Sequence, residues 1–285
     1  MCLTCGQHVT ERLWYLEPEK HRLQSLGLLQ DVFNRHLPPI VDAGLWVIGH
    51  KQPYGKRHQL NGVSRQLFNW LTQTVHGVQV LPDQASAFKV IDLANELALM
   101  PCPCRQIIAP HLPPAWKCLG LNLAAKIYFR RETPEPVRAI GKEEAKTLVA
   151  EWRAQGAYQS VGWLWNANVV WVCNCDQYCA SHRLYEVEWA TVPSFVVAHL
   201  ARPEACQGCQ ACARWCLRPG ALSFDADGRA AIDEALCRGC GLCVEHCPHG
   251  ALGFAPRRVF YDVLHKTARP LSPERVTIES GPKAQ

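Results

Sequence analysis

The chain contains two matching cysteine runs, CQGCQACARWC at residues 206–216 and CRGCGLCVEHCP at residues 237–248. Each run has the spacing C-x2-C-x2-C-x3-C, so the second is an internal duplicate of the first. Thiols at every third position of a loop can surround a compact group, while the fourth thiol leaves on the next turn of the chain. Small residues stand between the thiols, where a larger side chain would collide with such a group: Gly208, Ala211, Ala213, Gly239 and Gly241.

The spacing of both runs is typical of bacterial iron-sulfur ligation, in which the fourth cysteine of a run ligates the other cluster of the pair. We therefore predict two ligand sets. One consists of Cys206, Cys209, Cys212 and Cys247, and the other of Cys237, Cys240, Cys243 and Cys216. A zinc site is the alternative, but zinc usually takes two C-x2-C pairs that stand roughly a dozen or more residues apart.

Residues around the two runs predict short strands. The dipeptide Asp227-Gly228 favours a hairpin turn between strands at 221–224 and 230–233. Residues 196–200 and 251–254 would supply an outer pair of strands. The predicted fold class is α+β, with a mixed α/β N-terminal domain followed by a small two-hairpin, two-helix ferredoxin-like dicluster module.

This region resembles the bacterial-type two-cluster ferredoxin domain over about 60 residues. The resemblance implies two 4Fe-4S clusters, one-electron transfer, and redox protein partners or a larger oxidoreductase complex. One departure from the pattern is visible. Cys216 is followed by Leu217, whereas Cys247 is followed directly by Pro248, so the surroundings of the two clusters are expected to differ.

Six further cysteines lie upstream and form candidate metal ligands: Cys102, Cys104, Cys118, Cys173, Cys175 and Cys179. In an extended segment, residues i and i+2 face the same side, so each C-x-C pair can aim two thiols at one target. A third iron-sulfur cluster or a zinc ion is the prediction. Buried structural cysteines and a redox-active disulfide remain the alternatives.

The C-x-C-R and C-N-C elements at residues 102–105 and 173–175 loosely resemble those of poorly characterised iron-sulfur proteins of anaerobic microbes. That resemblance implies no activity, and no catalytic residue is assigned. Arg105 would either lie at the surface or hold an anion beside Cys104. Cys2 and Cys5 make a lone C-x2-C, which is half of a zinc site at most.

Length and composition set the domain organisation. The 285 residues, 48% of them hydrophobic, suggest more than one globular part. We expect a cysteine-containing mixed domain over 1–195, the dicluster module over 196–256 and a tail over 257–285. No stretch approaches the roughly 18 apolar residues of a membrane helix, and no signal peptide is recognised at the start. The expected location is the cytoplasm, where 16 cysteines favour metal or redox chemistry over disulfides.

Apolar periodicity predicts several elements upstream of the runs. Helices are expected at 60–75, 85–100 and 143–155, and strands at 78–81, 121–130 and 163–172. A short helix is expected at 259–265. The basic residues near Lys51 predict a solvated loop, so no nucleic-acid partner is expected.

Three functions remain open from the sequence, of which the least favoured is a cluster-bearing sensor or scaffold whose redox state governs binding. The first is an electron-transfer protein or the electron-carrying subunit of a complex. The second is an oxidoreductase whose metal site is built from the upstream cysteines and is fed by the ferredoxin module. No nucleotide-binding or flavin-binding motif is recognised.

Overall fold

A computed structural model of the protein describes residues 13–21, 76–102, 105, 115–129, 137–164, 168–176, 191–262 and 267–270. Its largest element is a seven-stranded sheet with the strand order β4-β2-β3-β6-β5-β1-β7. Neighbouring strands run antiparallel except β1 and β7, which are parallel. The strands are β1 (His76–Val80), β2 (Leu97–Met100), β3 (Cys118–Leu121), β4 (Arg138–Ala139), β5 (Tyr158–Leu164), β6 (Asn168–Cys175) and β7 (Thr191–Val192).

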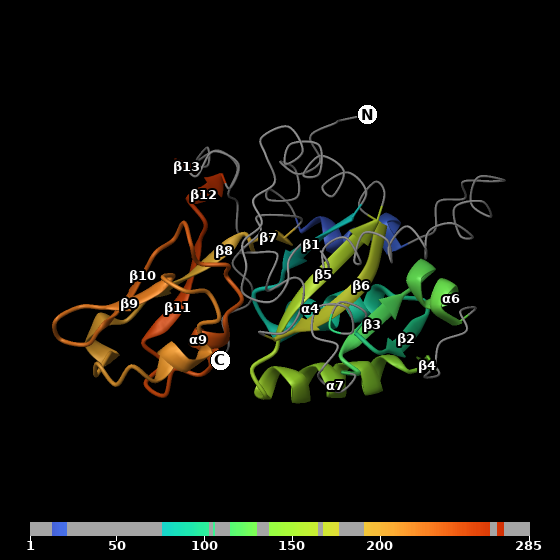
Figure 1. Cartoon of the computed structure of the whole chain (residues 1–285), viewed down its shortest axis with the longest axis horizontal. Coiled ribbons are helices and arrows are strands. Elements are labelled where there is room, and N and C mark those ends of the chain that lie inside the picture. The colour runs from blue at the N-terminus through green and yellow to red at the C-terminus, as the bar shows by residue number, and fades with distance from the viewer. Residues whose placement is uncertain are drawn as a thin grey trace.

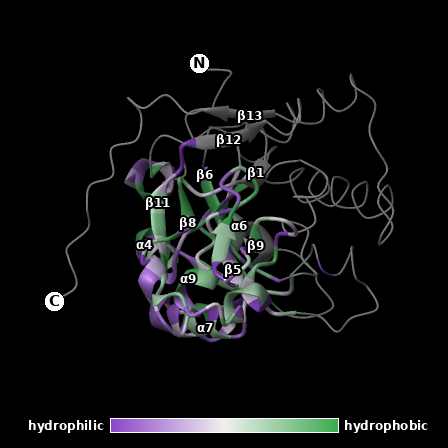
Figure 2. Ribbon diagram, turned by 90° about the vertical axis from the view of Figure 1, so that its left-hand side faces the viewer, coloured by the Kyte–Doolittle hydropathy of each residue, from purple (hydrophilic) through white to green (hydrophobic). Residues whose placement is uncertain are grey.

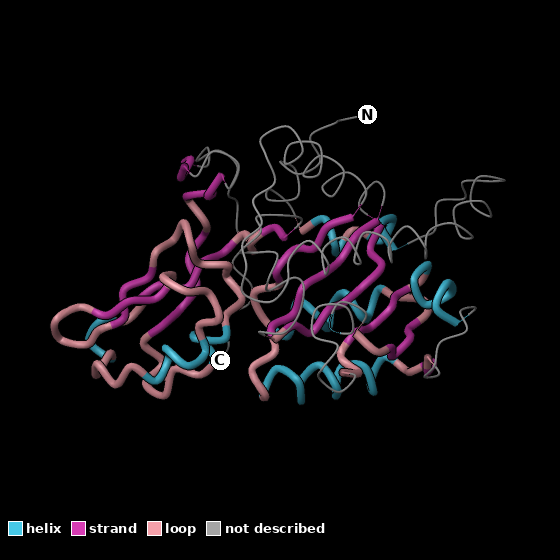
Figure 3. Tube along the Cα trace, in the orientation of Figure 1, coloured by secondary structure: helices cyan, strands magenta, loops and turns pink. Residues whose placement is uncertain are grey.

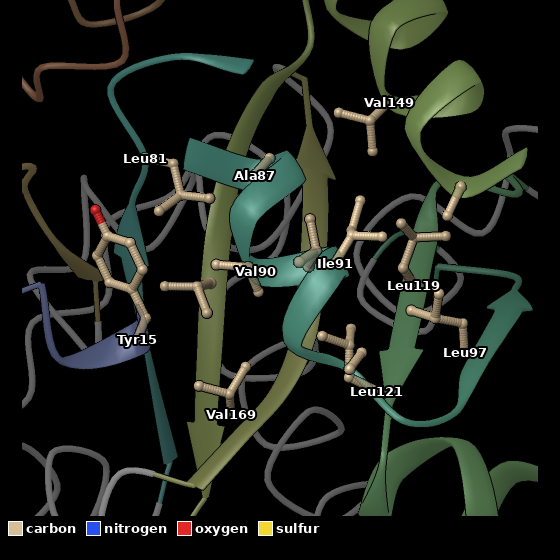
Figure 4. Close-up of a cluster of buried hydrophobic side chains, with 14 of the residues drawn as sticks. Tyr15, Leu81, Ala87, Val90, Ile91, Leu97, Leu119, Leu121, Val149 and Val169 are labelled. Carbon is tan, nitrogen blue, oxygen red and sulfur yellow. The ribbon is translucent and has the colours of Figure 1, made fainter. Parts of the chain in front are cut away.

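One face of this sheet is covered by helices α4 (Gln84–Leu93) and α7 (Lys142–Ala154). Asp83 caps α4 by accepting a hydrogen bond of 2.7 Å from the amide of Ser86. Figure 4 shows the resulting core, in which side chains from α4 and α7 meet those of the strands. The largest of the apolar clusters among the described residues therefore lies on this face.

The opposite face carries a second apolar cluster. Helix α6 (Leu123–Phe129) contributes Leu123 and Ala124 to it, and the strands contribute Tyr158, Trp171 and several cysteines. Leu242, from the C-terminal part of the chain, is fully buried in the same cluster. Figure 2 shows hydrophobic residues along β5 and β8, and both hydrophilic and hydrophobic residues on α7.

Beside the large sheet lies a smaller unit made of two pairs of strands, as Figures 1 and 3 show. Strand β8 (Val196–Leu200) pairs antiparallel with β11 (Leu252–Pro256), and β9 (Leu222–Phe224) pairs antiparallel with β10 (Ala230–Ile232). The helical elements between the strands are 3-10 turns at Pro203–Ala205 and Ala211–Trp215 and helix α9 (Leu242–Glu245). The strand pairs expected around the two cysteine runs are present, and Gly228 has the positive φ of 75° that its turn needs.

Three expected elements are wrong. The helix expected at 85–100 ends at Leu93, and β2 follows, because a short buried strand and a helix have similar apolar content. The strand expected at 121–130 is helix α6, which begins after Asn122 turns the chain with a φ of 51°. The helix expected at 259–265 starts instead as β12 (Val259–Asp262), which pairs with β13 (Thr267–Pro270).

Other predictions hold in full or in part. The helix expected at 143–155 is confirmed as α7, whose acidic first turn contains Glu143 and Glu144. The strand expected at 78–81 falls on β1. The single strand expected at 163–172 is instead the end of β5 and the start of β6, which pair antiparallel. The helix expected at 60–75 lies outside the described residues. Over the part of the chain that the structure describes, no helix is long and apolar enough to cross a bilayer.

Candidate metal centres

A cavity between the smaller unit and the large sheet is lined by Cys216, Cys237, Cys240 and Cys243, and has an empty volume of about 520 Å³ that is partly open to solvent. We call it the inner cavity. Tyr158 of β5 and Trp215 also line it, so residues of both parts of the chain meet there. Three of the four cysteines come from the second run and one from the first.

A second cavity, the outer cavity, is lined by Cys206, Cys209, Cys212 and Cys247 and has an empty volume of about 320 Å³. Here three cysteines come from the first run and one from the second. Cys209 is exposed, whereas Cys212 is buried. The structure thus groups the eight cysteines in the two sets expected from cross-ligation.

Two glycines of the second cysteine run have a backbone conformation that other residues rarely adopt. Gly239 and Gly241 have positive φ values of 69° and 74°, which residues with a side chain rarely adopt. A Cβ at Gly239 would collide with the carbonyl oxygen of Val196, and one at Gly241 would collide with that of Pro82. Both positions therefore require glycine, and both lie where the ligand loop touches neighbouring backbone.

Backbone amides point at two of the thiols. Gly239 N donates to Cys237 Sγ at 3.4 Å, and Ala251 N donates to Cys247 Sγ at 3.3 Å. Such N–H···S contacts stabilise a thiolate, and they are among the features that tune iron-sulfur centres. The donor set therefore fits an anionic, thiolate-ligated group in each cavity.

Burial affects the thiols unequally. It raises the pKa of Cys240 to about 11, and it also raises the pKa of Cys216 and Cys243. Burial by itself would raise the pKa of Cys247, but hydrogen bonds to its sulfur outweigh that effect and lower it. These bonds come from the backbone at Leu252, Ala251, His249 and Gly250. Buried thiols that ionise with difficulty become thiolate ligands when a metal shares the charge.

Two buried arginines hold the ligand loop of the inner cavity. Arg153, at the end of α7 and 1% exposed, donates from Nη2 to the carbonyl oxygen of Cys240 at 2.9 Å. Arg257, also 1% exposed, donates from Nη2 to the carbonyl oxygen of Cys237 at 2.8 Å. Sequence reasoning missed both residues, because neither lies in a cysteine motif and a lone arginine carries no signal of burial.

Arg153 is the better connected of the two. Its guanidinium forms two hydrogen bonds with Glu245 of α9, at 2.6 and 2.8 Å, and donates to Gln159 Oε1 at 2.6 Å. Gln159 Nε2 donates to Asn174 Oδ1 at 3.1 Å, and Asn174 Nδ2 donates to the carbonyl oxygen of Lys117 at 3.0 Å. A buried polar chain thus runs from the inner cavity into the large sheet.

Four of the six upstream cysteines are described: Cys102, Cys118, Cys173 and Cys175. Cys118 of β3 and Cys173 of β6 are register partners. Hydrogen bonds with Cys102 and Cys173, followed by burial, raise the pKa of Cys118 well above its ordinary value. We call Cys102, Cys118 and Cys173 the upstream thiol group.

Cys104 and Cys179 lie outside the described residues, as do Cys2 and Cys5. Within the described ranges, no group of three or more His, Cys, Asp or Glu side chains is arranged to hold a single metal ion. Arg105 forms an ion pair with Asp176, because its Nη1 lies 3.3 Å from Asp176 Oδ2. The same carboxylate lies 3.6 Å from Lys117 Nζ.

His246 and His249, which flank Cys247 and Pro248, occupy different places. The ring of His246 stacks on Trp215 with a centroid distance of 3.6 Å, and its Nδ1 lies 2.9 Å from the carbonyl oxygen of Leu242. His249 lines the outer cavity. The two cavities therefore differ in their aromatic and histidine surroundings.

Comparison with known proteins finds a match to a family model over the second cysteine run and its flanks. The family model described as a 4Fe-4S binding domain matches residues 230–253. The translation initiation factor rli1 of Schizosaccharomyces pombe is 39% identical over 72 residues, which cover 23% of this chain and 12% of that protein. The chain thus spans about an eighth of the length of this relative. No solved structure matches the chain.

The chain has mixed helix and sheet content and contains a ferredoxin-like region that binds a 4Fe-4S cluster.

Proposed function

We propose that this chain is an electron-transfer protein that carries two 4Fe-4S clusters. The observation that supports it is the grouping of eight cysteines around two cavities, each with three thiols from one run and one from the other. In this proposal Cys237, Cys240, Cys243 and Cys216 hold the inner cluster, and Cys206, Cys209, Cys212 and Cys247 hold the outer one. Each cluster, when bound, supplies a one-electron redox couple.

The two sites would have different roles. The outer cavity opens beside the exposed residues Gln207, Cys209 and Gln210, so a redox protein partner can approach it closely. The inner cavity is closed on one side by Tyr158 of the large sheet. We therefore assign partner docking to the outer site and exchange with the N-terminal part of the chain to the inner one.

The same proposal divides the chain into a domain over 1–195, the dicluster module over 196–256 and a further segment over 257–285. Strand β8 begins at Val196 and β11 ends at Pro256, which supports the bounds of the module. The partners would be redox proteins or the other subunits of an oxidoreductase complex.

Iron and acid-labile sulfide analysis of anaerobically purified protein tests the proposal. Two clusters give about eight irons and eight sulfides per chain, with two reducible EPR signals. Protein that is free of iron after anaerobic purification and reconstitution, or that holds zinc alone, would contradict it.

An oxidoreductase is the second candidate, and one observation favours it. The upstream cysteines Cys102, Cys118 and Cys175 belong to one buried apolar cluster, and the inner-cavity cysteine Cys240 packs against that cluster, as does Cys173. A third cluster or a zinc ion at the upstream cysteines, completed by Cys104 and Cys179, would place a metal site next to the inner one. A third cluster predicts about twelve irons per chain.

The two candidates are separated by Cys104→Ala and Cys175→Ala. If the N-terminal site is catalytic, turnover of an identified substrate is lost in these variants while both ferredoxin-type EPR signals remain. If the chain is a carrier alone, electron transfer to a redox partner proceeds at the wild-type rate.

A further inference from the structure

Cys118 and Cys173 lie directly opposite each other on neighbouring antiparallel strands. The adjacent pair, Lys117 and Asn174, is joined by a backbone hydrogen bond of 3.2 Å from Asn174 N to the carbonyl oxygen of Lys117. Hydrogen-bonded and non-hydrogen-bonded pairs alternate along an antiparallel ladder, so Cys118 and Cys173 form a non-hydrogen-bonded pair. In such pairs the Cα atoms are about 4.5 Å apart and the side chains approach most closely.

This geometry suits a disulfide that is easily reduced. Disulfides have Cα separations of roughly 4.4 to 6.8 Å, and most lie near 5.5 to 6 Å. A non-hydrogen-bonded strand pair falls at the short end of that range, where deviation from the preferred geometry makes the bond more reducible. The Cys102 thiol also contacts Cys118, but Cys102 is not its strand partner, because Met100, two residues earlier, holds that register position.

Cys118 is buried and Cys173 is partly buried, and the pair is not isolated from the inner cavity. Cys118 is 5% exposed. Cys175, two residues beyond Cys173, is the register partner of Tyr158, which lines the inner cavity. An apolar path therefore leads from the thiol pair to the inner-cavity cysteines.

A second connection runs through hydrogen bonds. The polar chain that begins at the carbonyl of Cys240 passes through Arg153 and Gln159 and ends at Asn174 and the carbonyl of Lys117. Asn174 directly follows Cys173 in the sequence, and Lys117 directly precedes Cys118. This contact gives the asparagine of the Cys173-Asn174-Cys175 element a role, because its amide joins the two strands that carry the thiols.

We infer that Cys118 and Cys173 form a two-electron dithiol–disulfide couple that exchanges electrons with the inner cluster site. The inference rests on the proposed function, since two reduced 4Fe-4S clusters are the reductant. Each cluster gives up one electron, the S–S bond breaks, and two protons from water complete the two thiols. Reoxidation forms the S–S bond, returns one electron to each cluster and releases the two protons.

Counting electrons tests the inference. The anaerobic protein is oxidised with ferricyanide, freed of the oxidant and titrated with dithionite while both EPR signals and the free thiols are followed. The wild-type chain should take up about four electron equivalents, two at the clusters and two at the disulfide. Cys118→Ser and Cys173→Ser should take up about two equivalents with both cluster signals intact.

Mass spectrometry gives a readout that needs no variant. Peptides from the alkylated, oxidised wild-type protein should contain a Cys118–Cys173 link, and the link should be absent after reduction. Val169→Ala is the matched control, because it truncates a buried side chain on the same strand, β6, and should leave both the link and the four equivalents.

Three results would overturn the inference. The wild-type chain could take up only about two electron equivalents, or it could take up about three and contain about twelve irons, which indicates a third cluster. The third is a disulfide link that excludes Cys118 or Cys173. Failure of the proposed function looks different, since iron and both EPR signals would then be missing whatever the state of the thiols.

Discussion

Arg153 Nη2 lies 2.9 Å from the carbonyl oxygen of Cys240, so a residue of helix α7 contacts a cysteine that lines the inner cavity. The guanidinium is buried, and the carboxylate of Glu245 pairs with it through two hydrogen bonds. A change in the charge of either side chain should therefore affect the inner cluster more than the outer one.

Replacing Arg153 and replacing Glu245 should shift the midpoint potential of the inner cluster in opposite directions. Two unit charges roughly 8 Å apart interact by about 2 kcal/mol at an effective dielectric constant of about 20, which corresponds to roughly 90 mV for a one-electron couple. Arg153→Met removes a positive charge and should lower one of the two midpoint potentials by tens of millivolts. Glu245→Gln should raise the same potential by a smaller amount, because this carboxylate is partly exposed. EPR-monitored redox titration measures both, with the second cluster as the internal control. Equal shifts of the two potentials would contradict the placement of Arg153.

Cross-ligation predicts which cluster each fourth cysteine serves. Cys247 belongs to the second run but lines the outer cavity, and Cys216 belongs to the first run but lines the inner one. Cys216→Ser should therefore disturb the EPR signal that shifts in Arg153→Met, and Cys247→Ser should disturb the other. The reverse assignment would show that each run ligates its own cluster.

Gly241 should not tolerate a side chain. A positive φ costs a residue other than glycine roughly 1–2 kcal/mol, and a Cβ at Gly241 would also collide with the carbonyl oxygen of Pro82. Gly241→Ala is expected to lower the free energy of unfolding by at least about 2 kcal/mol, measured by anaerobic urea denaturation of the cluster-loaded protein. Gly141→Ala is the control, since nothing lies within 4 Å of a Cβ there and its φ is −80°. A loss of less than about 1 kcal/mol is expected for it. Equal stability of the two variants would contradict this account of Gly241.

Gln159 should be essential to the buried polar chain. Gln159→Leu leaves a donor of Arg153 and the side-chain oxygen of Asn174 without this partner. Each buried polar group left unsatisfied costs about 1–3 kcal/mol, so the variant, which leaves two such groups, should lose about 2–6 kcal/mol of stability. Gln155→Leu is the matched control, because Gln155 is an exposed residue just beyond α7. Similar losses in both variants would mean that the chain of hydrogen bonds contributes little.

The outcome of the sequence predictions followed the length and pattern of each segment. Helix α7 was predictable because Ala145, Val149 and Trp152 recur at helical spacing over about two turns of this 13-residue helix. Segments of a few buried residues were not, since β2 is buried at every position and has no alternation that marks a strand. Helix α6 was mistaken for a strand because Ile127, Tyr128 and Phe129 favour strands, whereas the turn at Asn122 and the packing of Leu123 and Ala124 set its conformation.

The sequence by itself determined the ferredoxin-like region, because the duplicated thiol spacing suits the shape of a 4Fe-4S group and requires small residues between the ligands. Tertiary structure alone placed Arg153 and Arg257 on the ligand carbonyls and set Cys118 against Cys173. Those relationships depend on strand register and on packing between segments far apart in the chain. Such long-range contacts leave no spacing in the sequence from which they could be read.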